Sequence, residues 1–141
     1  MKQRISALGF LLLCMTFFAS VTGCYASREK AYYSNRGNFI TEEAIVENII
    51  YIQESNKIVL WLTDIDPSYQ AKEFMISGDN ASEAIENEIM IKVNIGDTII
   101  FTSAPHYFGN GYFMPIIGIT IENTEILNME TGYQNLMNSY K

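Results

Sequence analysis

Cysteine is scarce in this sequence, and its placement excludes a disulfide framework. The chain of 141 residues has two cysteines, Cys14 and Cys24, and no cysteine follows Cys24. Both lie in or beside one apolar stretch near the start of the chain, and a disulfide between them is the weakest interpretation of the pair. The rest of the chain must therefore fold on its hydrophobic core alone, without covalent cross-links.

Histidine is scarcer still, because His106 is the only one. Beyond Cys24 a metal site would therefore need oxygen ligands, and His106 with Met114 has no cysteine to complete a blue-copper site. The acidic stretch from 77 to 88 offers oxygen atoms on Asp79, Asn80, Glu83, Glu86 and Glu88. That stretch lacks the alternating ligand spacing of a calcium loop. We therefore predict no metal and no other cofactor.

Basic residues are few, which excludes a nucleic-acid partner. Residues 38–141 hold four lysines against fifteen Asp and Glu, a net charge of −11, whereas residues 25–37 carry a net charge of +2. A protein that binds nucleic acid needs a basic surface to meet the phosphates. The acidity of residues 38–141 instead serves to keep a domain soluble.

The sequence has one long apolar run, from Ile5 to Ala19, and it is about 15 residues long. A membrane-spanning helix needs about 20 predominantly apolar residues. The run follows a basic head, Lys2 and Arg4, and precedes the small and polar residues 20–23. This order is typical of a secretory signal peptide.

Val21-Thr22-Gly23-Cys24 resembles the lipobox of bacterial lipoproteins. The resemblance covers residues 1–24. It implies that the Cys24 sulfur receives a diacylglyceryl group, that a peptidase cuts between Gly23 and Cys24, and that acyl chains such as palmitate anchor the chain to a membrane, facing outside the cytoplasm. Two or three acyl chains hold a protein at a bilayer where one chain does not. A plain signal peptide cut elsewhere, or an uncleaved helix, are the alternatives.

These features predict a signal peptide at 1–23, a lipidated tether at 24–37 and a single domain at 38–141. The tether shows no clean periodicity, and its bases can contact anionic head groups while the acidic domain stands away from them. In composition and layout, the domain is similar to small uncharacterised lipoproteins of low-GC Gram-positive bacteria, a likeness that implies no activity.

The sequence pattern predicts that most of the domain forms β-strands. Patterns rich in β-branched and aromatic residues predict strands at 44–53, 57–65, 73–77, 89–93, 98–103, 117–122 and 125–128. A short helix is expected at 80–89, with Asn80 as its N-cap and Glu83 completing a capping box. Tyr133, Leu136, Met137 and Tyr140 have the spacing of an amphipathic terminal helix.

Short strands around one internal helix predict a mostly β fold: a small, closed or partly closed barrel. Its order of elements is similar to the five-stranded oligonucleotide/oligosaccharide-binding (OB) barrel, with a C-terminal helix in addition. A two-layer α+β sandwich is the alternative. Trp61, in the middle of an apolar strand, is expected in the core.

The loop between the strands at 98–103 and 117–122 is the candidate binding site. Its candidate residues are His106, Tyr107, Phe108, Asn110 and Tyr112. Aromatic rings on a loop can bind a peptide, a sugar or another ligand with an apolar face. The alternative is a long hairpin whose aromatic residues cover one end of the barrel.

No catalytic set is recognisable in the sequence. Ser103 and His106 are close in sequence but lie where a strand ends in a turn, and there is no Gly-x-Ser-x-Gly elbow. Asp64 and Asp66 would project to one side of an extended strand, as paired carboxylates of glycosidases do, but Asp66-Pro67 indicates a turn.

We therefore expect a membrane-anchored extracytoplasmic lipoprotein whose domain binds an envelope protein or a cell-wall component. The alternative is a small hydrolase that acts on wall sugars or peptides through Asp64 and Asp66, or through His106. A third possibility is a structural or assembly role without a separable ligand.

Overall fold

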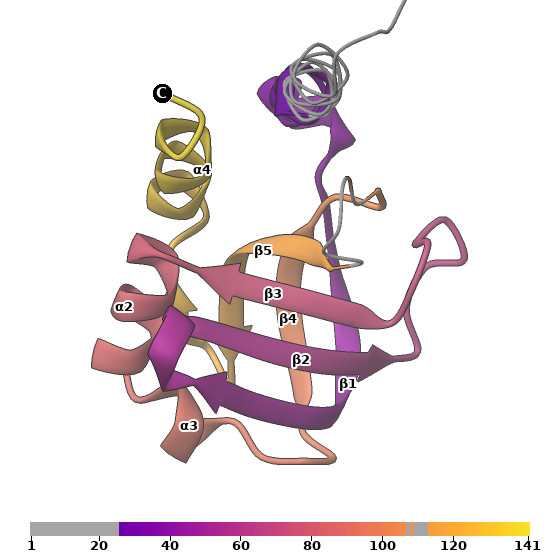
Figure 1. The fold of residues 1–141 in the computed structure, drawn as a ribbon. Coiled ribbons are helices and arrows are strands. Elements are labelled where there is room, and N and C mark those ends of the chain that lie inside the picture. Colours follow the sequence, from indigo (N-terminus) through magenta and orange to yellow (C-terminus); the bar gives the residue numbers. More distant parts are fainter. Residues whose placement is uncertain (1–25, 107, 109–112) are drawn as a thin grey trace, which may run out of the picture.

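The computed structural model describes residues 26–106, 108 and 113–141 (Figure 1). In chain order its elements are a helix over residues 26–34, the 3-10 helix η1 (Arg36–Asn38), β1 (Ile40–Ile52), the 3-10 helix η2 (Gln53–Ser55), β2 (Lys57–Thr63), β3 (Glu73–Ser77), α2 (Asp79–Glu86), α3 (Ile89–Lys92), β4 (Thr98–Ser103), β5 (Met114–Ile121), β6 (Thr124–Leu127) and α4 (Met129–Asn138). Within these ranges no helix has both the length and the hydropathy to cross a bilayer.

Five strands close into a barrel. The hydrogen-bonded order is β3-β2-β1-β4-β5, and a parallel pairing of β3 with β5 joins the two ends. β6 extends β5 as an antiparallel sixth strand. The OB-like barrel with an internal helix and a C-terminal helix is confirmed, and the alternative of a two-layer sandwich is wrong.

The long strand β1 belongs to both halves of the barrel. Residues 40–45 pair with β4, whereas residues 45–52 pair with β2. Ile45 pairs with both neighbours, and a bulge between Val46 and Asn48 follows directly after it. Because a bulge bends its strand and increases the local twist, it lets β1 turn from one half of the sheet into the other.

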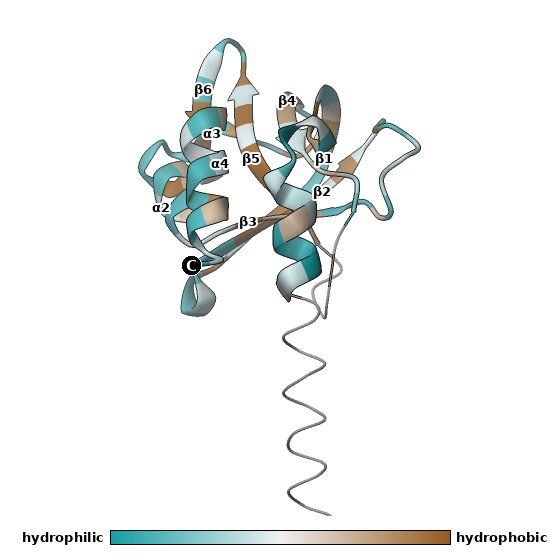
Figure 2. Cartoon of the chain, turned by 90° about the horizontal axis from the view of Figure 1, so that it is seen from above, coloured by the Kyte–Doolittle hydropathy of each residue, from teal (hydrophilic) through white to brown (hydrophobic). Residues whose placement is uncertain are grey.

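The core fills the barrel interior, and most of the hydrophobic residues lie on the strands (Figure 2). The rings of Phe74 and Phe101 meet there edge to face, with 5.1 Å between centroids. Tyr69, from the loop between β2 and β3, packs on both rings. Trp61 is not part of this core: it is half-buried on the outer face of β2, because the inward positions of that strand are Ile58, Leu60 and Leu62.

The internal helix departs from its predicted boundaries. Gly78, at φ +59°, is the N-cap of α2, so Asn80 lies inside the helix and the predicted capping box is wrong. Residues 89–92 form helix α3 rather than a strand. Glu88 adopts a left-handed conformation that starts a new turn, which buries Ile89 and leaves Ile91 74% exposed. Because the apolar residues at 89–93 suit either a strand or a short helix, the sequence pattern alone did not identify α3.

The terminal helix α4 is confirmed and starts earlier than its amphipathic spacing indicated. Asn128 is its N-cap, because the Asn128 side chain accepts a hydrogen bond from the backbone N–H of Thr131 at 3.0 Å. The short strand β6 also pairs back on β5, as its sequence indicated.

The stretch predicted as a tether contains regular structure. Residues 26–34 are helical, and Tyr33 is 1% exposed. This helix lies above the end of the barrel at which β1 begins, whereas α3 lies at the opposite end (Figure 1). The sequence pattern did not indicate this helix, because only Glu29, Tyr32 and Tyr33 face the protein and they make no regular apolar stripe.

Candidate functional site

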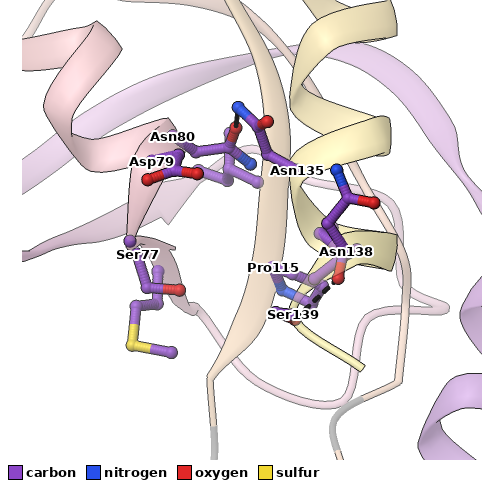
Figure 3. Close-up of a pocket in the computed structure, with 11 residues that line it drawn as sticks. Ser77, Asp79, Asn80, Pro115, Asn135, Asn138 and Ser139 are labelled. Carbon is purple, nitrogen blue, oxygen red and sulfur yellow. Dashed lines mark hydrogen bonds between the residues drawn. The ribbon is translucent and has the colours of Figure 1, made fainter. Parts of the chain in front are cut away.

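A groove of about 260 Å³ opens on the barrel wall, between β3, the start of β5, α2 and α4 (Figure 3). Its lining residues are Met75, Ser77, Gly78, Asp79, Asn80, Pro115, Ile116, Asn135, Leu136, Asn138 and Ser139. Sites for small molecules typically measure about 300–1,000 Å³. The groove therefore has room for one residue or ring of a longer ligand.

The groove exists because the barrel is barely closed at this point. β3 and β5 pair only through Phe74 with Met114 and Met75 with Pro115. Among the described residues, no β3–β5 pair follows Met75 and Pro115. The two parallel strands therefore diverge beyond Met75, and α2 and α4 form the walls of the opening.

Gly132 sets the position of α4 over this seam. A Cβ atom at Gly132 would lie 1.9 Å from the carbonyl oxygen of Ile117 and 2.8 Å from its carbonyl carbon. Only a residue without a side chain lets the helix backbone approach β5 this closely. The close approach places the last turns of α4, with Asn135 and Asn138, beside the groove.

Asn80 ties α2 to α4 and is 5% exposed. Its Nδ2 donates to the carbonyl oxygen of Gly132 at 2.9 Å, and its Oδ1 accepts from Nδ2 of Asn135 at 2.9 Å. Figure 3 shows the two amide side chains facing each other across the inner end of the groove. A buried amide must be paired in this way, since an unsatisfied one costs about 1–3 kcal/mol.

Three polar side chains remain open to the groove. Ser77 and Asp79 lie on one side and Asn138 lies on the other (Figure 3). All three are exposed, and no other described residue pairs with them. A hydroxyl, a carboxylate and an amide supply both donors and acceptors. Asp79 is the only charged residue in the lining, so the groove suits neutral or cationic groups.

An apolar strip runs beside the groove on the outer face of β1, β2 and β3. The strip consists of Ile50, Val59 and Met75, which the register places in one cross-strand row, and of Trp61 in the next row, where the polar residues Asn48 and Glu73 flank it. Ile50 is 40% exposed, Met75 and Trp61 are half-buried, and Val59 is buried. In Figure 1 these three strands face the viewer, and no helix covers them. Met75 belongs to both the strip and the groove, so the two form one continuous surface.

The predicted binding loop is only partly described. His106 is exposed, and its ring packs edge-on against Tyr32 with 5.3 Å between centroids. Phe108 is half-buried against Tyr32 and Tyr33. The other candidate residues, Tyr107, Asn110 and Tyr112, lie outside the described residues. The described part of the loop therefore contacts the helix over residues 26–34.

Ser103 and His106 do not form a nucleophile and base. Ser103 is fully buried, and its hydroxyl donates to the carbonyl oxygen of Pro115 at 2.8 Å. The His106 side chain lies on the surface beside Tyr32. Neither residue contributes to the groove lining.

Asp64 and Asp66 lie in the loop between β2 and β3, where both are exposed. The Asp66 carboxylate accepts a hydrogen bond from the backbone N–H of Ser68 at 2.7 Å. Hydrogen bonding by Ser68 lowers the pKa of Asp66 below its ordinary value. A general acid needs the opposite shift, since it must hold its proton near neutral pH.

The acidic residues around α2 have separate roles. Glu83 accepts a hydrogen bond from the backbone N–H of Asn128 at 3.2 Å, and Glu88 pairs with Lys92 at 3.3 Å. Glu86 is exposed, and Asp79 lines the groove. Across the described part of the chain, no three His, Cys, Asp or Glu side chains are grouped so as to hold a metal ion.

No known family model, curated protein or solved structure matches this chain.

Sequence patterns did not reveal the groove, because its residues come from four elements far apart in the chain. The available signal was a run of amides in the terminal helix, Asn135 and Asn138, on the side opposite Tyr133 and Tyr140. Amides in a helix that otherwise packs on a sheet indicate a polar contact, but they do not indicate with which element.

Proposed function

We propose that this protein is a membrane-anchored lipoprotein, held outside the cytoplasm by acylated Cys24, whose barrel binds a component of the cell envelope. The anchor is supported by the basic head, the short apolar run and the Val21–Cys24 motif. The binding role is supported by the groove and the uncovered sheet face.

The observation that carries the binding role is the set of open polar groups beside an apolar strip. The side chains of Ser77, Asp79 and Asn138 make no hydrogen bond with the rest of the described chain, while Met75 and Leu136 supply apolar contact. A ligand with polar groups along one edge and an apolar face fits this combination. The net charge of −11 over residues 38–141 favours a neutral or cationic ligand over an anionic one.

No observation favours the alternative of a hydrolase. The Asp66 carboxylate accepts a hydrogen bond from Ser68, and the buried Ser103 hydroxyl donates one to the carbonyl oxygen of Pro115. Binding is therefore the function that the geometry supports best.

The test of the groove uses the full-length protein in vesicles, mixed with purified envelope fractions. The variant Asp79→Asn/Asn138→Ala removes the charge and one amide, and neither side chain bonds within the described chain. We expect retention of envelope material to fall at least about tenfold, which corresponds to 1.4 kcal/mol. Equal retention would show that the groove is not the binding site.

A matched control is Glu86→Gln, which changes an exposed carboxylate to an amide in the same helix as Asp79 but outside the groove. This control should retain as much material as the wild type. A second variant, Tyr107→Ala/Tyr112→Ala, tests the loop between β4 and β5. If this variant retains less envelope material and the groove variant retains as much as the wild type, the binding site is the loop.

The anchor is tested independently with Cys24→Ser. We expect this variant to lose labelling by radioactive palmitate and to leave the membrane fraction or remain as an uncut precursor. Continued palmitate labelling of Cys24→Ser would refute the lipidation site.

A further inference from the structure

The helix over residues 26–34 is firmly attached to the barrel, although it begins only two residues after Cys24. Tyr33 is fully buried, and its hydroxyl donates to the carbonyl oxygen of His106 at 2.9 Å. Its ring also packs against Phe39 and Tyr140, at centroid distances of 5.9 and 6.4 Å. The helix therefore contacts the β4–β5 loop, the start of β1 and the end of the chain at once.

Further bonds hold the residues that follow. The Tyr133 hydroxyl donates to the carbonyl oxygen of Ser34 at 2.9 Å, and the Asn38 side chain donates to the carbonyl oxygen of Tyr32 at 2.8 Å. Arg36 binds both carboxylate oxygens of Glu130, at 2.5 and 2.7 Å. These attachments leave no free linker between residue 26 and the barrel.

Chain length sets how far the barrel can lie from the lipidated residue. One residue, Tyr25, separates Cys24 from Ala26. A helix rises about 1.5 Å per residue, so Ala26 lies about 10 Å along the helix from Tyr33. Two extended residues add at most about 7 Å. The anchored end of the barrel is thus within about 20 Å of the acylated sulfur.

The exposed charged side chains of this helix are basic. Arg28 and Lys30 are exposed, and Lys30 Nζ also donates to the carbonyl oxygen of Tyr140 at 3.4 Å, whereas Glu29, Tyr32 and Tyr33 turn toward the protein. Residues 38–141 carry a net charge of −11, so the basic residues of this helix give the end of the protein near Cys24 a charge opposite to that of the barrel. Basic residues next to a lipid anchor are attracted to anionic head groups.

We infer that the helix over residues 26–34 is a rigid stalk that holds the barrel in one orientation on an anionic lipid surface, with Arg28 and Lys30 against the head groups. This inference rests on the proposed lipid anchor. It replaces the expected tether, in which the sequence indicated no regular structure, by a fixed support. The end of the barrel with α3 then points away from the membrane, and the groove on the barrel wall stays accessible (Figure 1).

The chain is well suited to test this arrangement, because an introduced cysteine would be the only free thiol once Cys14 is removed and Cys24 is acylated. Ala31→Cys places a fluorophore on the exposed side of the stalk, and Ile95→Cys places one in the exposed turn near α3. Energy transfer to acceptor lipids is then measured for the full-length lipidated protein in vesicles of anionic phosphatidylglycerol and phosphatidylcholine. We expect strong transfer from position 31 and at least about threefold weaker transfer from position 95.

The decisive comparison inserts ten Gly and Ser residues between Tyr25 and Ala26. Such an insert has a root-mean-square length of about 18 Å, leaves the barrel unchanged and frees the stalk from the anchor. We expect transfer from position 31 to fall at least about twofold. Equal transfer from the two positions before insertion, or no change after it, would overturn the rigid stalk.

A separate experiment tests the role of Arg28 and Lys30. We expect Arg28→Glu/Lys30→Glu to weaken transfer from position 31 in anionic vesicles and to leave it unchanged in pure phosphatidylcholine. Unchanged transfer in both would refute the head-group contact. Palmitate labelling of each variant is measured first, and only labelled protein enters the energy-transfer comparison. A protein that is not labelled refutes the proposed anchor, whereas a labelled protein without the expected transfer refutes the stalk.

Discussion

Gly132 of α4 lies directly against the backbone of Ile117 in β5: an added Cβ would stand 1.9 Å from the Ile117 carbonyl oxygen. This contact determines how closely the C-terminal helix approaches the barrel. It therefore also determines the width of the groove, because the groove wall formed by Asn135 and Asn138 follows from the position of the helix.

Gly132→Ala should destabilise the fold strongly, because the clash is with backbone atoms that cannot rotate away. Overpacking typically costs about 1–3 kcal/mol and occasionally more, and we expect a loss of at least about 3 kcal/mol here. Urea unfolding followed by circular dichroism measures it. The control is Gly37→Ala, whose nearest neighbour is the Asn35 side chain at 3.2 Å, and it should cost less than about 1 kcal/mol.

Asn80→Ala should remove the link between α2 and α4. It leaves the carbonyl oxygen of Gly132 and the amide of Asn135 without their partner, so we expect a loss of about 2 kcal/mol in unfolding free energy. Asn138→Ala, which removes an exposed amide from the same groove, should change stability by less than about 0.5 kcal/mol. Equal effects of the two substitutions would contradict the structural role of Asn80.

Tyr33 offers a way to separate packing from hydrogen bonding. Tyr33→Phe loses only the bond to the His106 carbonyl oxygen and should cost about 1 kcal/mol. Tyr33→Ala also empties a buried ring position and should cost about 3–5 kcal/mol, with faster proteolysis at Arg28. Tyr32→Phe is the control, and a cost similar to that of Tyr33→Phe would show that the bond to His106 is not specific.

The ion pair between Arg36 and Glu130 should make stability depend on acid pH. Bonding to Arg36 lowers the pKa of Glu130 from 4.5 to about 2. A carboxyl with a lowered folded-state pKa contributes stability above its unfolded pKa and loses it as the pH falls through its folded pKa. The stability difference between wild type and Glu130→Gln should therefore shrink as the pH falls from 5 to 2. A difference that stays constant over this range would show that the pair does not contribute.

Tyr69 carries a buried hydroxyl with no hydrogen-bond partner among the described residues. Burial raises the pKa of this phenol, in line with a poorly solvated group. Tyr69→Phe keeps the ring between Phe74 and Phe101 and removes the unpaired hydroxyl. We expect a gain of about 1 kcal/mol in urea unfolding, and a clear loss would indicate that the hydroxyl is paired in solution.

Local patterns predicted the parts of this fold that depend on near neighbours. Alternating Ile residues in β5 and the spacing of Tyr133 to Tyr140 each have the period of the element that they predict, whereas the nearly continuous apolar run of β2 is typical of a strand with little exposed surface. The pattern was less reliable at 89–93, where Ile, Met and Val suit a strand but a left-handed Glu88 diverts the chain into helix α3.

By itself, the sequence determined the composition of this protein: a thiol-free acidic stretch over residues 38–141, an apolar run from Ile5 to Ala19 ahead of Val21-Thr22-Gly23-Cys24, and enough β-branched residues for a small barrel. Only the tertiary structure decided the groove, the support of Tyr33 by the His106 carbonyl and the contact of Gly132 with Ile117. These features join residues that lie 73 positions apart or come from separate elements. Their energy comes from close packing and from the satisfaction of buried polar groups, which exist only once the chain has folded.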